Sequence, residues 1–136
     1  MVDVTAKAIS HRVAIAEGMI HLQSATIMLI SESKIKKGNV LTTAELAGVQ
    51  AAKQTASLIP LCHTLMLGKV NVEAKLVEGG VHVSAEVKCT GQTGVEMEAL
   101  TAVSVALLTV YDMCKAVDKT MEIGQIKLLK KTKVEV

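Results

Sequence analysis

The chain has almost no aromatic side chains: among its 136 residues there is a single Tyr and no Phe or Trp. Proteins hold unpaired nucleic-acid bases largely by stacking them on aromatic rings, and this chain has no such platform. Its formal net charge is only +2, without an extended basic run, which also disfavours nucleic acid as a partner. The core must therefore be built from Val, Leu, Ile, Met and Ala.

Cysteine and long apolar runs are scarce as well. Cys62, Cys89 and Cys114 are an odd number without a CxxC pair, so we expect neither a disulfide framework nor a structural zinc site. The N-terminus has no charged lead into an apolar stretch, and the apolar run 102–110 is too short to cross a bilayer. These features predict a soluble, cytoplasmic protein with no membrane partner.

What the chain does have is apolar side chains, which make up half of its residues. Its length is that of one ordinary domain, so we expect a single domain over residues 1–136. With half of its residues apolar, a domain of this size has more apolar surface than it can readily bury in its own core. We therefore expect a homo-oligomer, and oligomers often place their pockets where subunits meet.

Hydrophobic periodicity and turn residues predict strands and helices along the whole chain. In order, they are a strand over 12–22, a short helix over 24–31, a helix over 43–58, a hairpin of strands over 69–77 and 81–89, a long helix over 94–117 and a strand over 125–129. We expect helices that cross between edge strands around a central hairpin. This order predicts a ferredoxin-like α+β fold, an antiparallel sheet with helices packed on one face.

Both long helices carry a predicted start signal. Thr42 and Glu45 have the spacing of a capping box at the first, and Thr93 and Glu96 have it at the second. Pro60 lies beyond the end of the first helix.

Polar residues within apolar runs are the first candidates for chemistry, because burying an unpaired charge costs several kcal/mol. Cys62 and His63 directly follow Pro60; their ordinary explanation is a core thiol and an imidazole bonded to a backbone carbonyl. Glu96 and Glu98 begin the long helix, where acids also serve as caps or favour the helix dipole.

Asp112 and Lys115 lie three residues apart near the other end of the same helix. A solvated ion pair is the ordinary explanation. However, the helical spacing puts Asp112 close to the stripe of Glu98, whose neighbours are nearly all apolar or small. A carboxylate there, next to an ammonium group, is poised for proton transfer.

Lysines form a looser set that spacing alone cannot assemble into a phosphate site. They are Lys36, Lys37, Lys53, Lys127, Lys130, Lys131 and Lys133. The chain has no P-loop, serine elbow, HExxH or dinucleotide fingerprint. The segment 91–94 offers backbone donors to an anion before a helix, which is a weak signal.

Six blocks together resemble the cyclic pyranopterin monophosphate synthase family, and they cover nearly the whole chain in the family's order. They are MVDVTAK from Met1, KGNV from Lys37, AGVQAAK from Ala47, IPLCH from Ile59, TGVEMEAL from Thr93 and YDMCKAV from Tyr111. The last two are far more specific than any short motif.

The resemblance implies a ferredoxin-like fold, a hexamer built as a trimer of dimers, and a lysine-rich site at a dimer interface. It also implies an early step of molybdenum cofactor biosynthesis. In that step, acid and base catalysis convert a cyclic dihydro-GTP, delivered by an upstream radical enzyme, to a pyranopterin with loss of diphosphate. This chemistry has no redox step and needs no cofactor or protein-bound metal.

The family pattern also assigns residues. It implies that Asp112 is the catalytic acid and base with Lys115 as its partner, and that Lys37 and Lys131 belong to the cationic site. The residues it implies for substrate binding are Leu61, Cys62, His63, Met97 and Glu98, with Arg12, Lys53 and Glu96 in matching blocks. Thr64 stands where the family usually has proline, and the family usually has residues before Met1.

Two other classes compete with this interpretation. One is a non-catalytic oligomeric module that holds a nucleotide with the same lysines. The other is a metal-dependent hydrolase, which we rank last because Cys62, His63, Glu96 and Glu98 lack the spacing of a metal site. Whether magnesium accompanies the triphosphate stays open.

A distance within the long helix predicts a shared site. Glu98 and Asp112 are fourteen residues apart, so they lie about 21 Å apart along the axis and differ by only about 40° in direction. A compact substrate cannot span that distance within one chain. Two such helices packed antiparallel across a two-fold axis would instead bring Glu98 of one subunit near Asp112 of the other.

Overall fold

The computed structural model describes all 136 residues, and every predicted strand and helix is present. The elements are β1 (Ser10–His21), α1 (Ser24–Ser31), α2 (Val40–Lys53), α3 (Thr55–Leu58), β2 (Leu67–Val77), β3 (Gly80–Gly91), α4 (Glu96–Cys114) and β4 (Glu122–Glu135). The helix predicted over 43–58 is divided into α2 and α3 at Gln54. The last strand is much longer than predicted, because it pairs with β1 along nearly the whole of that strand.

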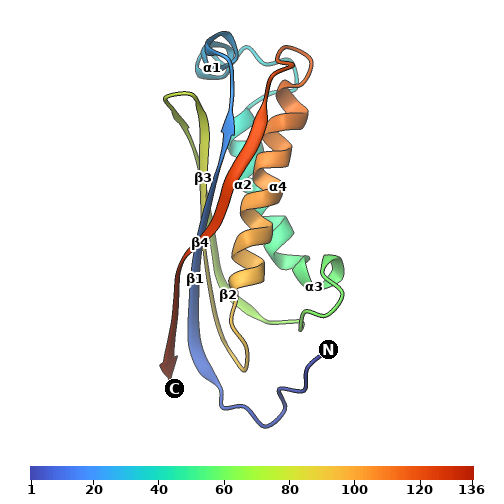
Figure 1. Ribbon diagram of the computed structural model, residues 1–136, viewed down its shortest axis with the longest axis vertical. Helices are drawn as coiled ribbons and strands as arrows, with labels where there is room; N and C mark the ends of the chain where they lie inside the picture. Colours follow the sequence, from blue (N-terminus) through green and yellow to red (C-terminus); the bar gives the residue numbers. More distant parts are fainter.

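The four strands form one antiparallel sheet in the order β2-β3-β1-β4, which confirms the ferredoxin-like α+β prediction (Figure 1). One detail of the expected topology is wrong. β1 is a central strand rather than an edge strand, and the hairpin contributes β2 to the edge and only β3 to the middle. The reason is that β3 returns along β1 over its full length, from Ser10 opposite Gly91 to His21 opposite Gly80.

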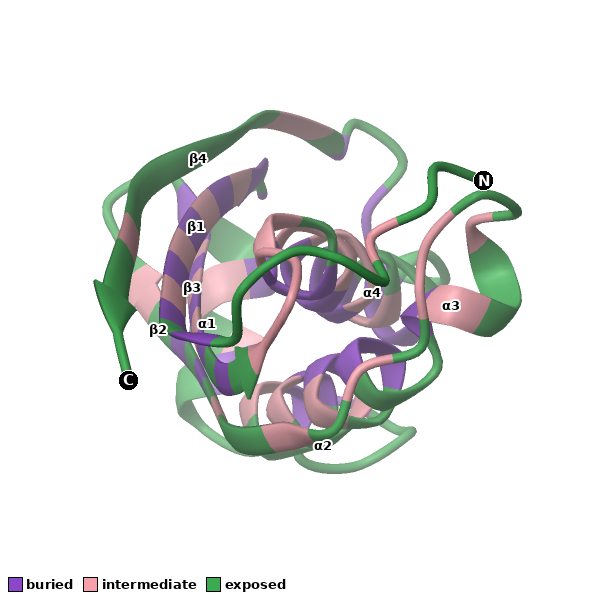
Figure 2. Ribbon diagram, turned by 90° about the horizontal axis from the view of Figure 1, so that it is seen from below, coloured by how far each residue is buried: buried purple, intermediate pink, exposed green.

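Burial alternates along the central strands, so one face of the sheet carries the core. Along β1 the residues Ala14, Ala16 and Ile20 are fully buried, while Ile15, Glu17 and Met19 are half-buried. The helices α2 and α4 pack on this buried face, and Figure 2 shows the buried segments concentrated between the sheet and these two helices. The outer face of the sheet has no helix over it.

Small residues let the two helices approach closely, which explains how a core can form without aromatic rings. A Cβ atom added at Gly48 of α2 would lie 2.9 Å from Cγ1 of Val72 and 3.0 Å from the carbonyl oxygen of Ala102 on α4. Ala99, Ala102 and Ala106 of α4 are fully buried. The tight packing of α4 onto the sheet and α2 determines where its two ends lie.

Neither predicted capping box forms. α2 begins earlier, at Val40, and the side chain of Asn39 accepts a hydrogen bond from the Thr42 amide at 3.0 Å. Glu45 instead accepts a hydrogen bond from the Ala74 amide of β2, also at 3.0 Å. At α4 the N-cap residue is Val95, without a side-chain cap, and Glu96 turns to Lys131 of β4. In both helices the glutamate expected to complete the capping box contacts a strand of the sheet instead.

α4 has 19 residues and is long and apolar enough to cross a membrane by length and composition alone. Its buried residues include Val103, Leu107 and Val110, which are completely covered by the sheet and α2. Half of the helix is buried within the domain, as befits the core helix of a small α+β protein.

Candidate active site

Two groups of polar residues lie at the two ends of α4. The first group surrounds a cavity at its N-terminal end, formed where the loops 59–66 and 92–95 meet the helix. The cavity has a volume of about 290 Å³ and is lined by Leu61, Cys62, His63, Leu65, Thr93, Gly94, Glu96, Met97 and Glu98. The structure thus brings together the two sequence motifs that end in His63 and begin at Thr93.

Glu98 is the buried acid of this cavity, with only 4% of its surface exposed. Burial raises the pKa of its carboxyl, and the neighbouring charge of Glu96 adds to this, while the backbone amide of Glu98 itself acts in the opposite direction. Burial and the same two acids also raise the pKa of the Cys62 thiol. The thiolate of Cys62 is therefore disfavoured, which makes this side chain a poor nucleophile.

Cations lie beside this cavity. Nζ of Lys131 on β4 lies 3.2 Å from Oε1 of Glu96. Arg12 on β1 is 9% exposed, and its Nε and Nη2 atoms have no hydrogen-bond partner within the chain; the fully buried Oγ of Ser10 has none either. Arg12 is close enough to Cys89 for its charge to lower the pKa of that thiol against burial and Glu98, which raise it. Buried donors without partners are suited to an anionic ligand.

His63 has a definite hydrogen-bond partner. Its Nε2 atom lies 2.7 Å from the carbonyl oxygen of Val2, and because a carbonyl only accepts, Nε2 carries the proton. A backbone carbonyl is the partner predicted for His63 if its role is structural. The partner, however, comes from the N-terminal segment, sixty-one residues away in the sequence.

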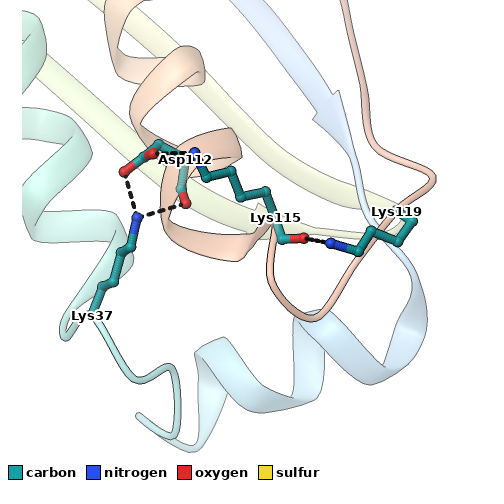
Figure 3. A network of polar contacts seen from close by, with 4 residues as sticks. All are labelled: Lys37, Asp112, Lys115 and Lys119. Carbon is teal, nitrogen blue, oxygen red and sulfur yellow. Dashed lines mark hydrogen bonds and ion pairs between the residues drawn. The ribbon is translucent and has the colours of Figure 1, made fainter.

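The second group lies at the C-terminal end of α4 and is shown in Figure 3. Nζ of Lys37, from the loop before α2, lies 2.9 Å from Oδ2 of Asp112 and donates a further hydrogen bond to the Asp112 carbonyl at 3.2 Å. Nζ of Lys115 lies 3.1 Å from Oδ1 of the same carboxylate. Lys119 donates a hydrogen bond to the Lys115 carbonyl at 2.7 Å. One carboxylate is thus held between two ammonium groups from different parts of the fold.

The surroundings of Asp112 differ from those expected. Its side chain is 55% exposed, so within one chain it is a solvated ion pair and does not lie among apolar neighbours. The hydrogen bonds from Lys37 and then Lys115 lower its pKa, helped by their charges. Helical spacing alone could not show that the last turns of α4 leave this face uncovered.

The family model described as the MoaC family matches residues 1–133. Relatives include the cyclic pyranopterin monophosphate synthases of Parvibaculum lavamentivorans, 58% identical over 134 residues, and of Chloroflexus aggregans, 56% identical over 133 residues. The alignments cover 97% and 96% of this chain and 84% and 81% of those proteins. The chain belongs to the MoaC family.

The residues singled out in this MoaC family chain fall into separate places. Seven of them lie in or beside the first cavity, namely Leu61, Cys62, His63, Glu96, Met97, Glu98 and Lys131. Arg12 lines a separate hollow with Lys69 and Cys89. Lys37, Asp112 and Lys115 form the second group. Lys53 joins neither; it lines a different hollow with Val49 and Lys69 that shares only Leu65 with the first cavity. The two groups are about 21 Å apart along α4.

Sequence reasoning missed Asp118, which supports the second group. It is 2% exposed, and its carboxylate accepts hydrogen bonds from the Gln23 amide at 2.9 Å and the Thr26 hydroxyl at 2.8 Å at the start of α1. The other oxygen accepts from the amide and hydroxyl of Thr120, both at 3.0 Å. An Asp two residues before a Thr is a turn signal, so the sequence could have predicted the hydrogen bonds between Asp118 and Thr120. The contacts with α1 have no such signal.

No group of three or more His, Cys, Asp or Glu side chains in the MoaC family chain is placed to hold a metal ion. The polar side chains available at and near both sites are acids, amines, one thiol, one hydroxyl, one imidazole and one guanidinium. Such groups bind anions and move protons.

Proposed function

We propose that this MoaC family chain is a cyclic pyranopterin monophosphate synthase. It converts a cyclic dihydro-GTP to cyclic pyranopterin monophosphate and diphosphate, an early step of molybdenum cofactor biosynthesis. The observation that carries the proposal is the identity of 54–58% with relatives of that name over nearly the whole chain. The reaction is a lyase reaction that proceeds by acid and base catalysis.

The charges of both groups suit such a substrate. A triphosphate needs cationic partners. Lys131 at the first site, Arg12 in the hollow beside Cys89, and Lys37 and Lys115 at the second site supply them. The purine must be opened and reclosed, which requires a group that takes up and returns protons. Asp112 and Lys115 are assigned this role, because their oxygen and nitrogen atoms are already 3.1 Å apart. The residues assigned to binding are those of the cavity, with Lys53 assigned a contact on the periphery.

The active site is assembled from two subunits. Within one chain the acids Glu98 and Asp112 are about 21 Å apart along α4, too far for one compact ring system to contact both. Two α4 helices packed antiparallel across a two-fold axis place the first group of each subunit against the second group of its partner. Each dimer then contains two equivalent sites, and three dimers form a cytoplasmic hexamer.

This assembly also supplies what the isolated chain lacks at Asp112. A carboxylate that is half exposed and paired with two lysines is a weak acid–base group, since its charged form is strongly favoured. Covering it with the partner subunit and the substrate removes water, which raises the pKa of a carboxyl. At phosphorus, a hydroxyl oxygen of the substrate attacks the α-phosphate and passes its proton to a base, while the bond to diphosphate breaks and diphosphate leaves with the electron pair.

The direct test is to incubate the purified protein with the cyclic dihydro-GTP intermediate and to measure pterin product and diphosphate. The two should form in equal amounts, and a sample with the Asp112→Asn variant serves as the control. Tight binding of the intermediate without either product would overturn the proposal. That result would instead support a non-catalytic nucleotide-binding module, the function favoured by the solvated ion pair of Asp112 in the single chain.

A further inference from the structure

The N-terminal segment, residues 1–7, lies beside the first cavity. Figures 1 and 2 show the N-terminus next to α3, at the end of the molecule where α4 begins. A hydrogen bond from His63 to the carbonyl of Val2 links it to a residue that lines the cavity.

Apolar burial does little to hold the start of this segment in place. Met1 and Val2 are 75% and 77% exposed, so their side chains contribute little by leaving water, and among the apolar residues of the segment only Val4 is half-buried. The position of the segment therefore depends mainly on polar contacts. Inside it, Asp3 accepts hydrogen bonds from the amide and hydroxyl of Thr5, which shapes a local turn without attaching it to the domain.

Besides His63, one further residue of the domain donates hydrogen bonds to this segment. Nε2 of Gln92, in the loop between β3 and α4, donates hydrogen bonds to the carbonyl oxygens of Thr5 at 3.0 Å and of Lys7 at 3.1 Å. A primary amide has two N–H donors, and here both are used on the same segment. The next residue along the chain from Gln92 is Thr93, which lines the cavity. Gln92 thus connects the segment to the same loop that builds the site.

We infer that Gln92 is a positioning residue, which holds the segment 1–7 against the domain so that the Val2 carbonyl orients the imidazole of His63 in the substrate site. The inference rests on the proposed function, in which His63 contacts substrate. Its chemistry follows from one fact: a carbonyl accepts but never donates. The segment therefore keeps the proton of a neutral imidazole on Nε2, and Nδ1 remains the ring nitrogen that can accept a hydrogen bond.

The inference is tested with three variants. Gln92→Leu keeps the size of the side chain and removes both donors, whereas Gln92→Lys keeps a donor at the end of a flexible chain. Gln54→Leu is the matched control, because Gln54 is exposed and its side chain makes no hydrogen bond. Neither Gln92 nor Gln54 has a buried side chain, so all three variants should fold like the wild type.

The first measurement is the ring Nε2–H resonance of His63 in protein labelled at its four histidines, assigned with His63→Gln. A hydrogen bond slows the exchange of this proton with water. We expect a resolved resonance in the wild type and Gln54→Leu, its loss in Gln92→Leu, and its return in Gln92→Lys. A wild type without this resonance, or a Gln92→Leu protein that keeps it unchanged, overturns the inference.

The second measurement is turnover of the cyclic dihydro-GTP. Losing one positioning hydrogen bond should lower kcat/KM of Gln92→Leu by about fivefold, with recovery in Gln92→Lys and no change in Gln54→Leu. If the ring proton is lost but kcat/KM is unchanged, the positioning role is wrong although the attachment is real. If the wild type itself does not turn over, the proposed function fails, and the resonance still decides whether Gln92 holds the segment.

Discussion

Nζ of Lys37 lies 2.9 Å from Oδ2 of Asp112, although seventy-five residues separate them in the sequence. The loop before α2 and the last turns of α4 are thereby joined at one carboxylate. Lys115 contacts the other oxygen of that carboxylate, so both lysines are in direct contact with Asp112. This arrangement requires the helices α2 and α4 to pack side by side, and it makes specific predictions.

Asp112→Asn and Lys115→Ala should abolish turnover while leaving the oligomer and its thermal transition nearly intact. Exposed ion pairs contribute little to stability, typically below about 1 kcal/mol, whereas acid–base groups contribute about two to four orders of magnitude to the rate. Turnover, size-exclusion chromatography and thermal unfolding measure the three properties. If either variant keeps near wild-type kcat, the catalytic assignment is wrong; loss of the fold would indicate a structural role.

Subunit mixing tests whether the two groups meet across an interface. Glu98→Ala and Asp112→Ala should each be inactive alone. In a mixed dimer one site carries both substitutions and the other carries neither. Random exchange makes half of the dimers mixed, so the mixture should recover roughly a quarter of wild-type activity. Each variant exchanged with itself is the control. No recovery, with exchange verified by mass spectrometry, would mean that Glu98 and Asp112 belong to different sites.

The same antiparallel packing determines which residue lies on the two-fold axis. If Glu98 is level with the partner's Asp112, the midpoint of the helix contact is Val105, which is half-buried within the single chain. Val105→Cys should therefore form a disulfide between subunits under mild oxidation, seen on a non-reducing gel. Thr101→Cys is the control, because two copies would be about 12 Å apart along the axis, beyond disulfide reach. Equal cross-linking of both variants, or none at Val105, contradicts this packing.

Burial of Glu98 predicts an effect of pH on stability. Its folded pKa is raised above the ordinary value of 4.5, so the folded protein holds this proton more tightly than the unfolded chain does. The resulting stabilisation is present below the unfolded pKa and is lost as pH rises through the folded pKa. Glu98→Gln should therefore unfold at a higher temperature than the wild type at neutral pH, with a smaller difference in acid. Thermal unfolding of both proteins from acid to neutral pH measures this difference in unfolding temperature. If the difference is the same at every pH, the pKa of Glu98 is not raised in the folded protein.

Local patterns predicted the elements of this fold well because most of them depend on neighbouring residues. The alternation of apolar and polar residues on both sides of Gly79 was sufficient to predict the hairpin. The helical spacing of apolar residues was sufficient to predict α4. The capping boxes failed because Glu45 and Glu96 find better partners on β2 and β4, and no local pattern can show such contacts. The central position of β1 likewise depends on pairings between residues as far apart as Ser10 and Gly91.

The candidate site was predictable to a smaller extent. The cavity at the start of α4 joins two motifs that were both recognised, but their proximity is a result of folding. The exposure of Asp112 was predicted wrongly, because two side chains that point in the same direction from a helix need not be equally buried. Glu98 lies in the cavity lined by residues of the loop 59–66, whereas Asp112 contacts only the lysines around it and is 55% exposed. Asp118 and Gln92 were missed as supports, since each acts on a segment about ninety residues away.

Glu98 and Asp112 lie on one uninterrupted helix of 19 residues, so the distance between them is fixed. Bending or sliding of α4 cannot widen the route by which substrate enters or diphosphate leaves. Such widening has to come from the irregular segments at the first cavity, chiefly the loop 59–66, or, in the proposed dimer, from rotation of one subunit against the other. If the proposed dimer rotates in this way, its two sites should open together, because the same two helices border both. Product release at one site would then be coupled to release at the other.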